Sequence, residues 1–143
     1  MQPDKQDSAV VPFVQVQSPV DLSTRHLTAH IFDPANPNNL DVVVLDAPDP
    51  DTKANHLYGI RLNGVGKGVV TFQSGPMGVT GPNGVTIESL VAIVIDRLQG
   101  FQNGPLVDPR NANAIANFQA GLQYLKDRTA DRIKRGVEGT LNP

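Results

Sequence analysis

The last third of the chain carries two apolar helical patterns that are separated by only a few residues. The first pattern begins at Thr86, and Gly104 with Pro105 ends it, while the second extends from Asp108 to about Arg135. So short a connection returns the second helix against the first, since helices joined by short loops pack as antiparallel neighbours. The sequence therefore predicts an antiparallel helical hairpin over residues 86–136.

The ends of both predicted helices carry the residue types that stabilise helix termini. Thr86 can accept a hydrogen bond from the first turn, and Glu88 lies where a negative charge is favoured by the helix dipole. Asp108 can cap the second helix, and Pro109 takes a first-turn position that tolerates proline. Gly136 is expected to end that helix.

The apolar residues of the predicted hairpin exceed what contact between two helices alone would cover. In the first helix they occupy more than one face, which predicts packing on more than one side. In the second they step by three and four and suit either the hairpin contact or a contact between subunits. We therefore expect a homo-oligomer. The residues are Ile87, Leu90, Val91, Ile93, Val94, Ile95 and Leu98 in the first helix, and Ile115, Phe118, Leu122, Leu125 and Thr129 in the second.

The first half of the chain predicts an antiparallel β-sheet of about five strands. Short alternating or β-branched segments are separated by clusters of turn-forming residues, with one hairpin turn expected across residues 64–67. The fold class is thus α+β, with a disordered tail at 1–9 and a single domain at 10–143, divided into a sheet part (10–73) and the hairpin. The predicted strands are 10–17, 25–32, 41–46, 56–63 and 68–73.

The composition of the 143 residues excludes several kinds of site. The absence of cysteine excludes disulfides, thiolate metal sites and cysteine nucleophiles. His26 and His30 are four residues apart, but the alternating segment around them predicts a strand and no further ligand is placed to complete a metal site. No apolar run reaches the roughly 20 residues of a membrane-spanning helix. We expect no catalytic residues, no metal, no cofactor and no secretion signal.

Charge is unevenly distributed along the chain. Residues 1–55 carry a net charge of −5 and residues 56–143 a net charge of +3, with most of the basic excess in residues 126–135. Arg128, Arg132 and Arg135 share one face of the second helix there. Such a face is usually solvated and salt-bridged, yet it also suits phosphate oxygens, which guanidinium binds bidentately. Because the domain as a whole is not basic, no nucleic-acid partner is expected.

The connection between the helices also contains two residues with alternative roles. Phe101 is either part of the core at the end of the first helix or an aromatic surface on which a base stacks. Asn111 is either an ordinary first-turn residue or an amide that pairs with an adenine edge or a ribose. Residue type and position leave both alternatives open.

Four segments of the second half, read together, resemble a known family. They resemble the first type of Thoeris anti-defence sponge, small phage proteins that counter Thoeris defence and share a C-terminal helical hairpin with certain sponges that counter CBASS defence. The closing RTxxR…RGVEGT pattern is the most specific part. The matching segments are FQSGPMGVTGPNGV at 72–85, IDRLQGFQNGP at 95–105, PRNANA at 109–114 and RTADRIKRGVEGT at 128–140.

This resemblance implies a non-enzymatic sponge. The family binds cyclic ADP-ribose isomers made by TIR-domain proteins, and some members also bind cyclic trinucleotides, so that the defence effector stays inactive. It further implies dimers that can form hexamers, a location in the cytoplasm of the infected bacterial host, and no membrane partner. The alternatives are an enzyme that degrades cyclic nucleotides, and a structural or nucleic-acid-binding phage protein.

The resemblance also assigns site residues. The stacking aromatic corresponds to Phe101 and the polar residue at the start of the second helix to Asn111, both for ligands of the cyclic ADP-ribose type. The phosphate-binding residues for cyclic trinucleotides correspond to Arg128, Thr129 and Arg132. The chain departs from the family pattern at the turn, where it has Leu106 in place of an aromatic and Pro109 in place of an arginine.

Overall fold

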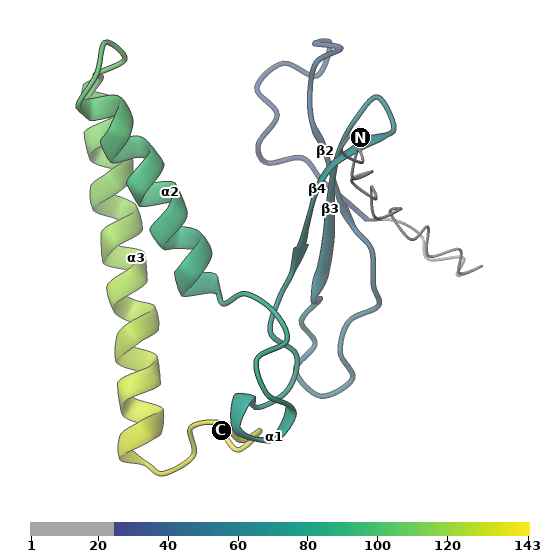
Figure 1. Cartoon of the computed structure of the whole chain (residues 1–143), viewed down its shortest axis with the longest axis vertical. Coiled ribbons are helices and arrows are strands. Elements are labelled where there is room, and N and C mark those ends of the chain that lie inside the picture. Colours follow the sequence, from purple (N-terminus) through teal and green to yellow (C-terminus); the bar gives the residue numbers. More distant parts are fainter. Residues whose placement is uncertain (1–24) are drawn as a thin grey trace, which may run out of the picture.

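The computed structural model describes residues 25–143 as a four-stranded antiparallel sheet followed by three helices, which confirms the predicted α+β class (Figure 1). The strands follow one another in the sheet in chain order. The strand predicted at residues 10–17 and the tail predicted at 1–9 lie outside the described residues. The elements are β1 (His26–Leu27), β2 (Asp41–Val44), β3 (Leu57–Leu62), β4 (Val65–Thr71), α1 (Met77–Thr80), α2 (Ile87–Gln102) and α3 (Pro109–Lys134).

The turn between β3 and β4 is tighter than the sequence predicted. Asn63 and Gly64 both have positive φ angles, of 50° and 77°, and Leu62 pairs directly with Val65. Two consecutive left-handed residues form the mirror-image turn that matches the twist of a hairpin, and Asn-Gly is the preferred pair for it. The expectation of a connection across residues 64–67 was therefore wrong, and β4 begins at Val65.

The strand predicted at residues 25–32 is reduced to the two residues of β1. Beyond Leu27 the chain enters a series of turns in which side chains replace the ladder partners of the backbone. Asp33 Oδ1 accepts from the backbone N–H of Ala35 at 2.9 Å, and Asn36 Oδ1 accepts from that of Asn38 at 2.9 Å. These short side chains favour turns because they bond the backbone two residues ahead.

The segment between β4 and α2 is an ordered loop that includes the single helical turn α1. The amide of Gln73 donates to the carbonyl of Gly81 at 2.9 Å and accepts from the N–H of Asn83 at 2.9 Å. Asn83 in turn bonds the backbone of Ser74 in both directions, at 2.8 and 2.7 Å. At Gly84 a Cβ would come within 2.4 Å of the backbone of Phe72, so only glycine permits this closure.

The helical hairpin agrees with the sequence prediction. Thr86 and Ser89 form a reciprocal capping box, with both hydrogen bonds at 3.1 Å. Asp108 caps α3 by accepting from the N–H of Arg110 at 2.7 Å. Gly136 follows α3 with a φ of 71°, the left-handed conformation that commonly ends a helix.

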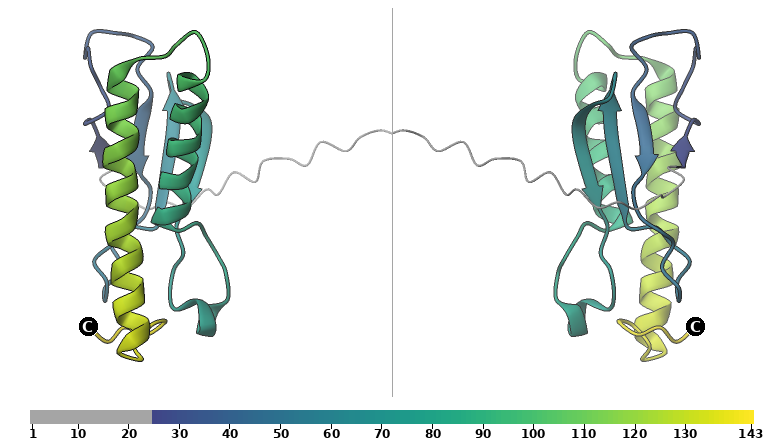
Figure 2. Two further views of the ribbon diagram at one scale, coloured as in Figure 1. Left: turned by 90° about the vertical axis from the view of Figure 1, so that its left-hand side faces the viewer. Right: turned by 90° about the vertical axis from the view of Figure 1, so that its right-hand side faces the viewer.

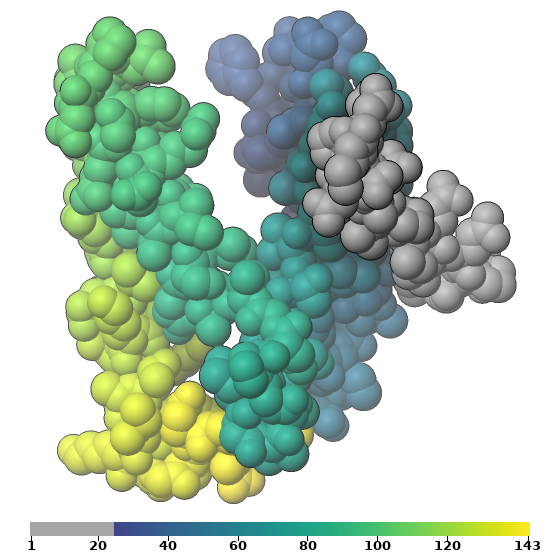
Figure 3. All heavy atoms as spheres, viewed as in Figure 1, coloured from purple at the N-terminus to yellow at the C-terminus, as the bar shows by residue number. Residues whose placement is uncertain are grey.

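The hairpin stands beside the sheet (Figure 2), and several of its apolar side chains are exposed, among them Ile87, Ile93, Val94 and Phe118. Among the described residues only Val43, Val44 and Ile95 are buried apolar side chains. The space-filling view shows an opening between α2 and the strands (Figure 3). The hairpin and the sheet come together near the loop that joins β4 to α2. None of the helices from residue 25 onward is long and apolar enough to cross a membrane.

Candidate ligand-binding site

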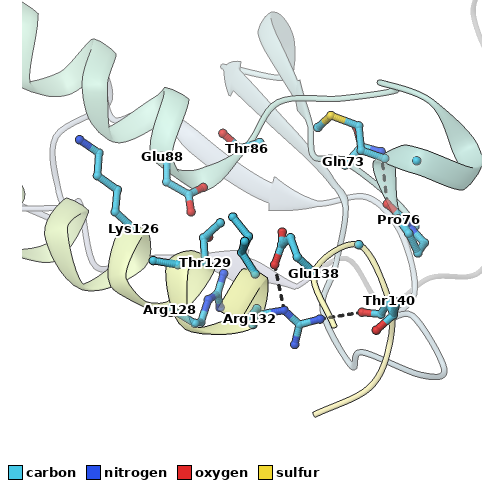
Figure 4. A pocket seen from close by; sticks show the side chains of 16 residues that line it. Gln73, Pro76, Thr86, Glu88, Lys126, Arg128, Thr129, Arg132, Glu138 and Thr140 are labelled. Atoms are coloured by element: carbon cyan, nitrogen blue, oxygen red, sulfur yellow. Dashed lines mark hydrogen bonds and ion pairs between the residues drawn. The ribbon is translucent and has the colours of Figure 1, made fainter. Parts of the chain in front are cut away.

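A cavity with a volume of about 880 Å³ lies at the C-terminal end of α3 (Figure 4). Three segments surround it: the last turns of α3, the loop from β4 through α1 to the start of α2, and the chain after α3. Side chains from separate elements therefore converge on it. They include Gln73 from the loop, Glu88 from α2, Lys126, Arg128 and Thr129 from α3, and Glu138 from the C-terminal segment.

Two cationic side chains of this pocket remain available. Lys126 and Arg128 are exposed and make no hydrogen bond or ion pair with any residue of the described part of the chain. Thr129 is half-buried beside them, and Glu88 faces them from α2 (Figure 4). The guanidinium, the ammonium and the hydroxyl that line the cavity are all donors for the oxygens of a phosphate.

Arg132 is engaged differently, because its guanidinium binds the chain that follows α3. Its Nε donates to Glu138 Oε2 at 3.2 Å and its Nη1 to the carbonyl of Asn142 at 3.0 Å. Its Nη2 donates to the carbonyls of Val137 and Thr140, at 3.0 and 2.7 Å. Four of the five N–H donors of an arginine are thereby used.

The chain after α3 is shaped to receive Arg132. Gly136 and Gly139 have φ angles of 71° and 74°, so the chain turns back twice and directs its carbonyls toward the guanidinium. The N–H of Val137 also donates to the carbonyl of Arg132 at 3.0 Å, which closes the helix end. The RGVEGT segment that follows thus forms a wall of the pocket, and Arg132 holds this wall in place.

The third arginine of the predicted face takes no part in the pocket lining. Arg135 pairs with Asp131 at 2.8 Å, one helical turn earlier, and donates to the carbonyl of Pro143 at 2.6 Å. The helical spacing correctly placed the arginines near one another, but it did not separate the available Arg128 from the engaged Arg132 and Arg135. It also missed Lys126, because that residue lies outside the arginine spacing.

Phe101 and Asn111 both lie near the α2–α3 connection, at the opposite end of the hairpin. Phe101 is half-buried in the last turn of α2, and the Cζ of Arg97 lies 5.1 Å from the centre of its ring, within range of a cation–π interaction. Asn111 is half-buried and its Nδ2 donates to the carbonyl of Leu106 at 3.2 Å. Arg97 precedes Phe101 by one helical turn, a spacing that could have identified it from the sequence.

The connection between α2 and α3 is held by polar contacts. Gln102 Oε1 accepts from the N–H of Asp108 at 2.9 Å, and Arg110 Nη2 donates to Asp108 Oδ2 at 2.6 Å. The hydrogen bond from the Arg110 side chain, together with that from its backbone N–H, lowers the pKa of the Asp108 carboxyl. The pKa of Arg110 is correspondingly raised by Asp108.

The structure does not bring the two predicted groups of residues together. Asn111 and Arg128 belong to the same helix and are separated by about 25 Å at about 1.5 Å per residue. Any ligand of nucleotide size can therefore contact only one of the groups within one subunit. In residues 25–143 no three histidine, aspartate or glutamate side chains are grouped to hold a metal ion.

Half of the chain is similar in sequence to a known phage protein. No protein-family model matches the chain. The chain is 51% identical over 71 residues to a protein named Thoeris anti-defense 1 from Bacillus phage SBSphiJ7. The match covers 50% of this chain. It also covers 50% of the relative, so the chain spans about half the length of that protein. Over this half, the chain is similar to a Thoeris anti-defence protein.

Proposed function

We propose that the protein is a phage anti-defence protein that sequesters cyclic nucleotide immune signals without altering them. The name of the relative supports the anti-defence role. The observation that carries the proposed mechanism is the 880 Å³ pocket, whose lining includes two cations, Lys126 and Arg128, that have no partner among the described residues. The protein would act where such signals accumulate, in the cytoplasm of the infected host cell.

The pocket suits the phosphates of a cyclic trinucleotide. Its volume falls within the range of about 300–1,000 Å³ that is typical of ligand sites. Arg128, Lys126 and Thr129 provide the donors, whereas Arg132 contributes mainly by positioning the wall that contains Glu138 and Thr140. Since Arg132 already neutralises Glu138, the two cations without a partner in residues 25–143 exceed the remaining acid of the lining, Glu88, and the pocket favours an anion.

The opposite end of the hairpin suits a ligand of the cyclic ADP-ribose type. The ring of Phe101 offers a stacking surface, and Arg97 beside it adds a positive charge near the ligand's phosphates. Asn111 can use its side-chain carbonyl oxygen, which accepts no hydrogen bond from the described residues. We infer that a second subunit completes this site, because Phe101 and Asn111 are only half-buried in one chain.

Binding without turnover is the mode that the larger pocket supports. Its described lining provides hydrogen-bond donors for phosphate from Lys126, Arg128 and Thr129. Catalysis would need in addition a nucleophile or an activated water held by a general base, a part that Glu88 would have to take. Sequestration needs only affinity.

A thermal-shift series tests the proposed ligand class. Cyclic ADP-ribose isomers and cyclic trinucleotides are compared with linear ADP-ribose and with linear trinucleotides of the same bases. A ligand at 100 times its dissociation constant stabilises the folded protein by about 2.7 kcal/mol. We expect this stabilisation from at least one cyclic ligand and little from its linear control. The absence of any shift with all cyclic ligands at millimolar concentration would refute the proposal.

A further inference from the structure

A second cavity of about 330 Å³ adjoins the larger pocket. The two share four lining residues, Gln73, Thr86, Glu88 and Arg128, so that Arg128 stands at their junction. The smaller cavity extends from this junction toward the sheet, where Tyr58 of β3 and Phe72, the residue that follows β4, form its wall. A molecule bound by Arg128 could therefore reach into either cavity.

The wall of the smaller cavity is aromatic. Tyr58 and Phe72 contact each other edge to face, with ring centres 5.6 Å apart and planes inclined by 83°. Tyr58 is paired with Val70, and Phe72 lies two residues further along the same strand direction, so both rings project from one face of the sheet. His56 lies on this face as well, and its carbonyl accepts from the N–H of Phe72 at 2.7 Å.

The aromatic wall is also held rigidly in place. On either side of Phe72, the N–H of Gln73 donates to the carbonyl of Val85 at 2.9 Å, and the N–H of Val85 donates to the carbonyl of Thr71 at 2.8 Å. Gly84 closes against the backbone of Phe72, where a side chain would clash. Rigid placement reduces the entropy that a ligand must overcome on binding.

We propose that this smaller cavity is a nucleobase subsite, in which a base lies against Tyr58 and Phe72 while Arg128 binds the phosphate of the same nucleotide. Every base has a π-face, so aromatic side chains accept bases with little regard to sequence. Glu88 faces the base in this arrangement, because a carboxylate accepts hydrogen bonds from base amino groups but repels phosphate. The inference rests on the proposed nucleotide-binding function.

Two small probes that differ only in the base test the subsite. AMP and ribose 5-phosphate are titrated separately into the full-length protein while the ring protons of Tyr58 and Phe72 are followed by NMR. We expect AMP to bind at least about fivefold more tightly, the weak end of base-stacking contributions, and to shift both sets of ring resonances. Equal affinities without ring shifts, or no binding of either probe at tens of millimolar, would overturn the subsite.

Variants separate the subsite from the phosphate contact. Phe72→Leu and Tyr58→Leu keep an apolar side chain and should reduce AMP affinity about fivefold while leaving ribose 5-phosphate unchanged. Arg128→Gln should weaken both probes. Phe118→Leu, an exposed aromatic of α3 outside both cavities, is the control and should change neither. If the Leu variants left AMP affinity unchanged, the subsite would be wrong.

The failure of this inference is distinguishable from the failure of the proposed function. If cyclic nucleotides stabilise the protein but AMP does not bind more tightly than ribose 5-phosphate, the proposed function is supported and the base subsite is wrong. If AMP binds more tightly than ribose 5-phosphate while no cyclic nucleotide stabilises the protein, the base subsite is supported and the proposed ligand class is wrong.

Discussion

At the scale of single residues, three arginines with the same helical spacing have three different environments. Arg128 is unengaged among the described residues, Arg132 binds the carbonyls and carboxylate of the chain after α3, and Arg135 pairs with Asp131. The spacing alone shows only that they share a side of the helix. What each guanidinium contacts depends on where the following eight residues turn, and two left-handed glycines decide that.

The two ends of the hairpin should bind different ligands independently. Phe101→Ala is expected to abolish binding of cyclic ADP-ribose-type ligands and to leave binding of cyclic trinucleotides intact, because about 25 Å of α3 separates the sites. Arg128→Gln should do the reverse, weakening trinucleotide binding by roughly thirtyfold, about 2 kcal/mol. Isothermal titration with both ligands measures this, and loss of both activities in either folded variant would contradict it.

Arg132 should affect folding as well as binding. Arg132→Ala removes four hydrogen bonds to the chain after α3 and is expected to lower the free energy of unfolding by about 1–3 kcal/mol. The released chain should become sensitive to limited proteolysis near residue 139. Lys134→Ala, an exposed residue with no described partner, is the control. An Arg132→Ala protein with unchanged stability and proteolysis would show that the guanidinium is free for ligand.

At the scale of elements, the sequence predicted the hairpin better than the sheet. The caps at Thr86 and Asp108 act within one helical turn, so their residue types suffice to place the helix ends. The loop containing α1 depends on bonds between Gln73 and Asn83, ten residues apart, and no local pattern indicates such a pair. The same holds for the pocket, since Glu88, Lys126 and Glu138 become neighbours only through tertiary structure.

The cap of α3 gives the hairpin connection a defined response to acid. The pKa of Asp108 is lowered in the folded state, first by the side chain of Arg110 and then by its N–H. Its stabilising contribution is therefore fully present above the unfolded pKa, near 3.9, and is lost as the pH falls through the lower folded value. Wild type and Asp108→Asn are compared by urea unfolding from pH 7 to pH 2.5. The stability difference should stay constant above about pH 5 and shrink below about pH 4, and a constant difference throughout would disprove the assignment.

At the scale of the whole molecule, one chain covers too little of its apolar surface. The hairpin and the sheet meet mainly around the loop before α2, and only three apolar side chains of the described part are buried (Figure 3). Exposed apolar residues on the hairpin include Ile93 at 62%, Phe118 at 40% and Ile133 at 62%. A second subunit that packs on the hairpin would cover apolar side chains of this kind.

The protein is therefore expected to be a homo-oligomer. Light scattering at micromolar concentration should give at least twice the mass of the 15.3 kDa chain. Ile93→Glu should reduce the mass because it places a charge on the uncovered face of α2. Val79→Glu, at an 82% exposed position of α1 away from that face, should leave it unchanged. A monomeric mass for the wild type would contradict this prediction.

The central claim is capture without chemistry, and recovery of the bound ligand tests it most directly. The protein is saturated with the cyclic nucleotide that stabilises it most, free ligand is removed by gel filtration, and the complex is denatured by heat. Chromatography then identifies and quantifies what is released. The account predicts the intact cyclic nucleotide, at no more than one equivalent per binding site, whereas a linear product that accumulates beyond one equivalent would show turnover and contradict it.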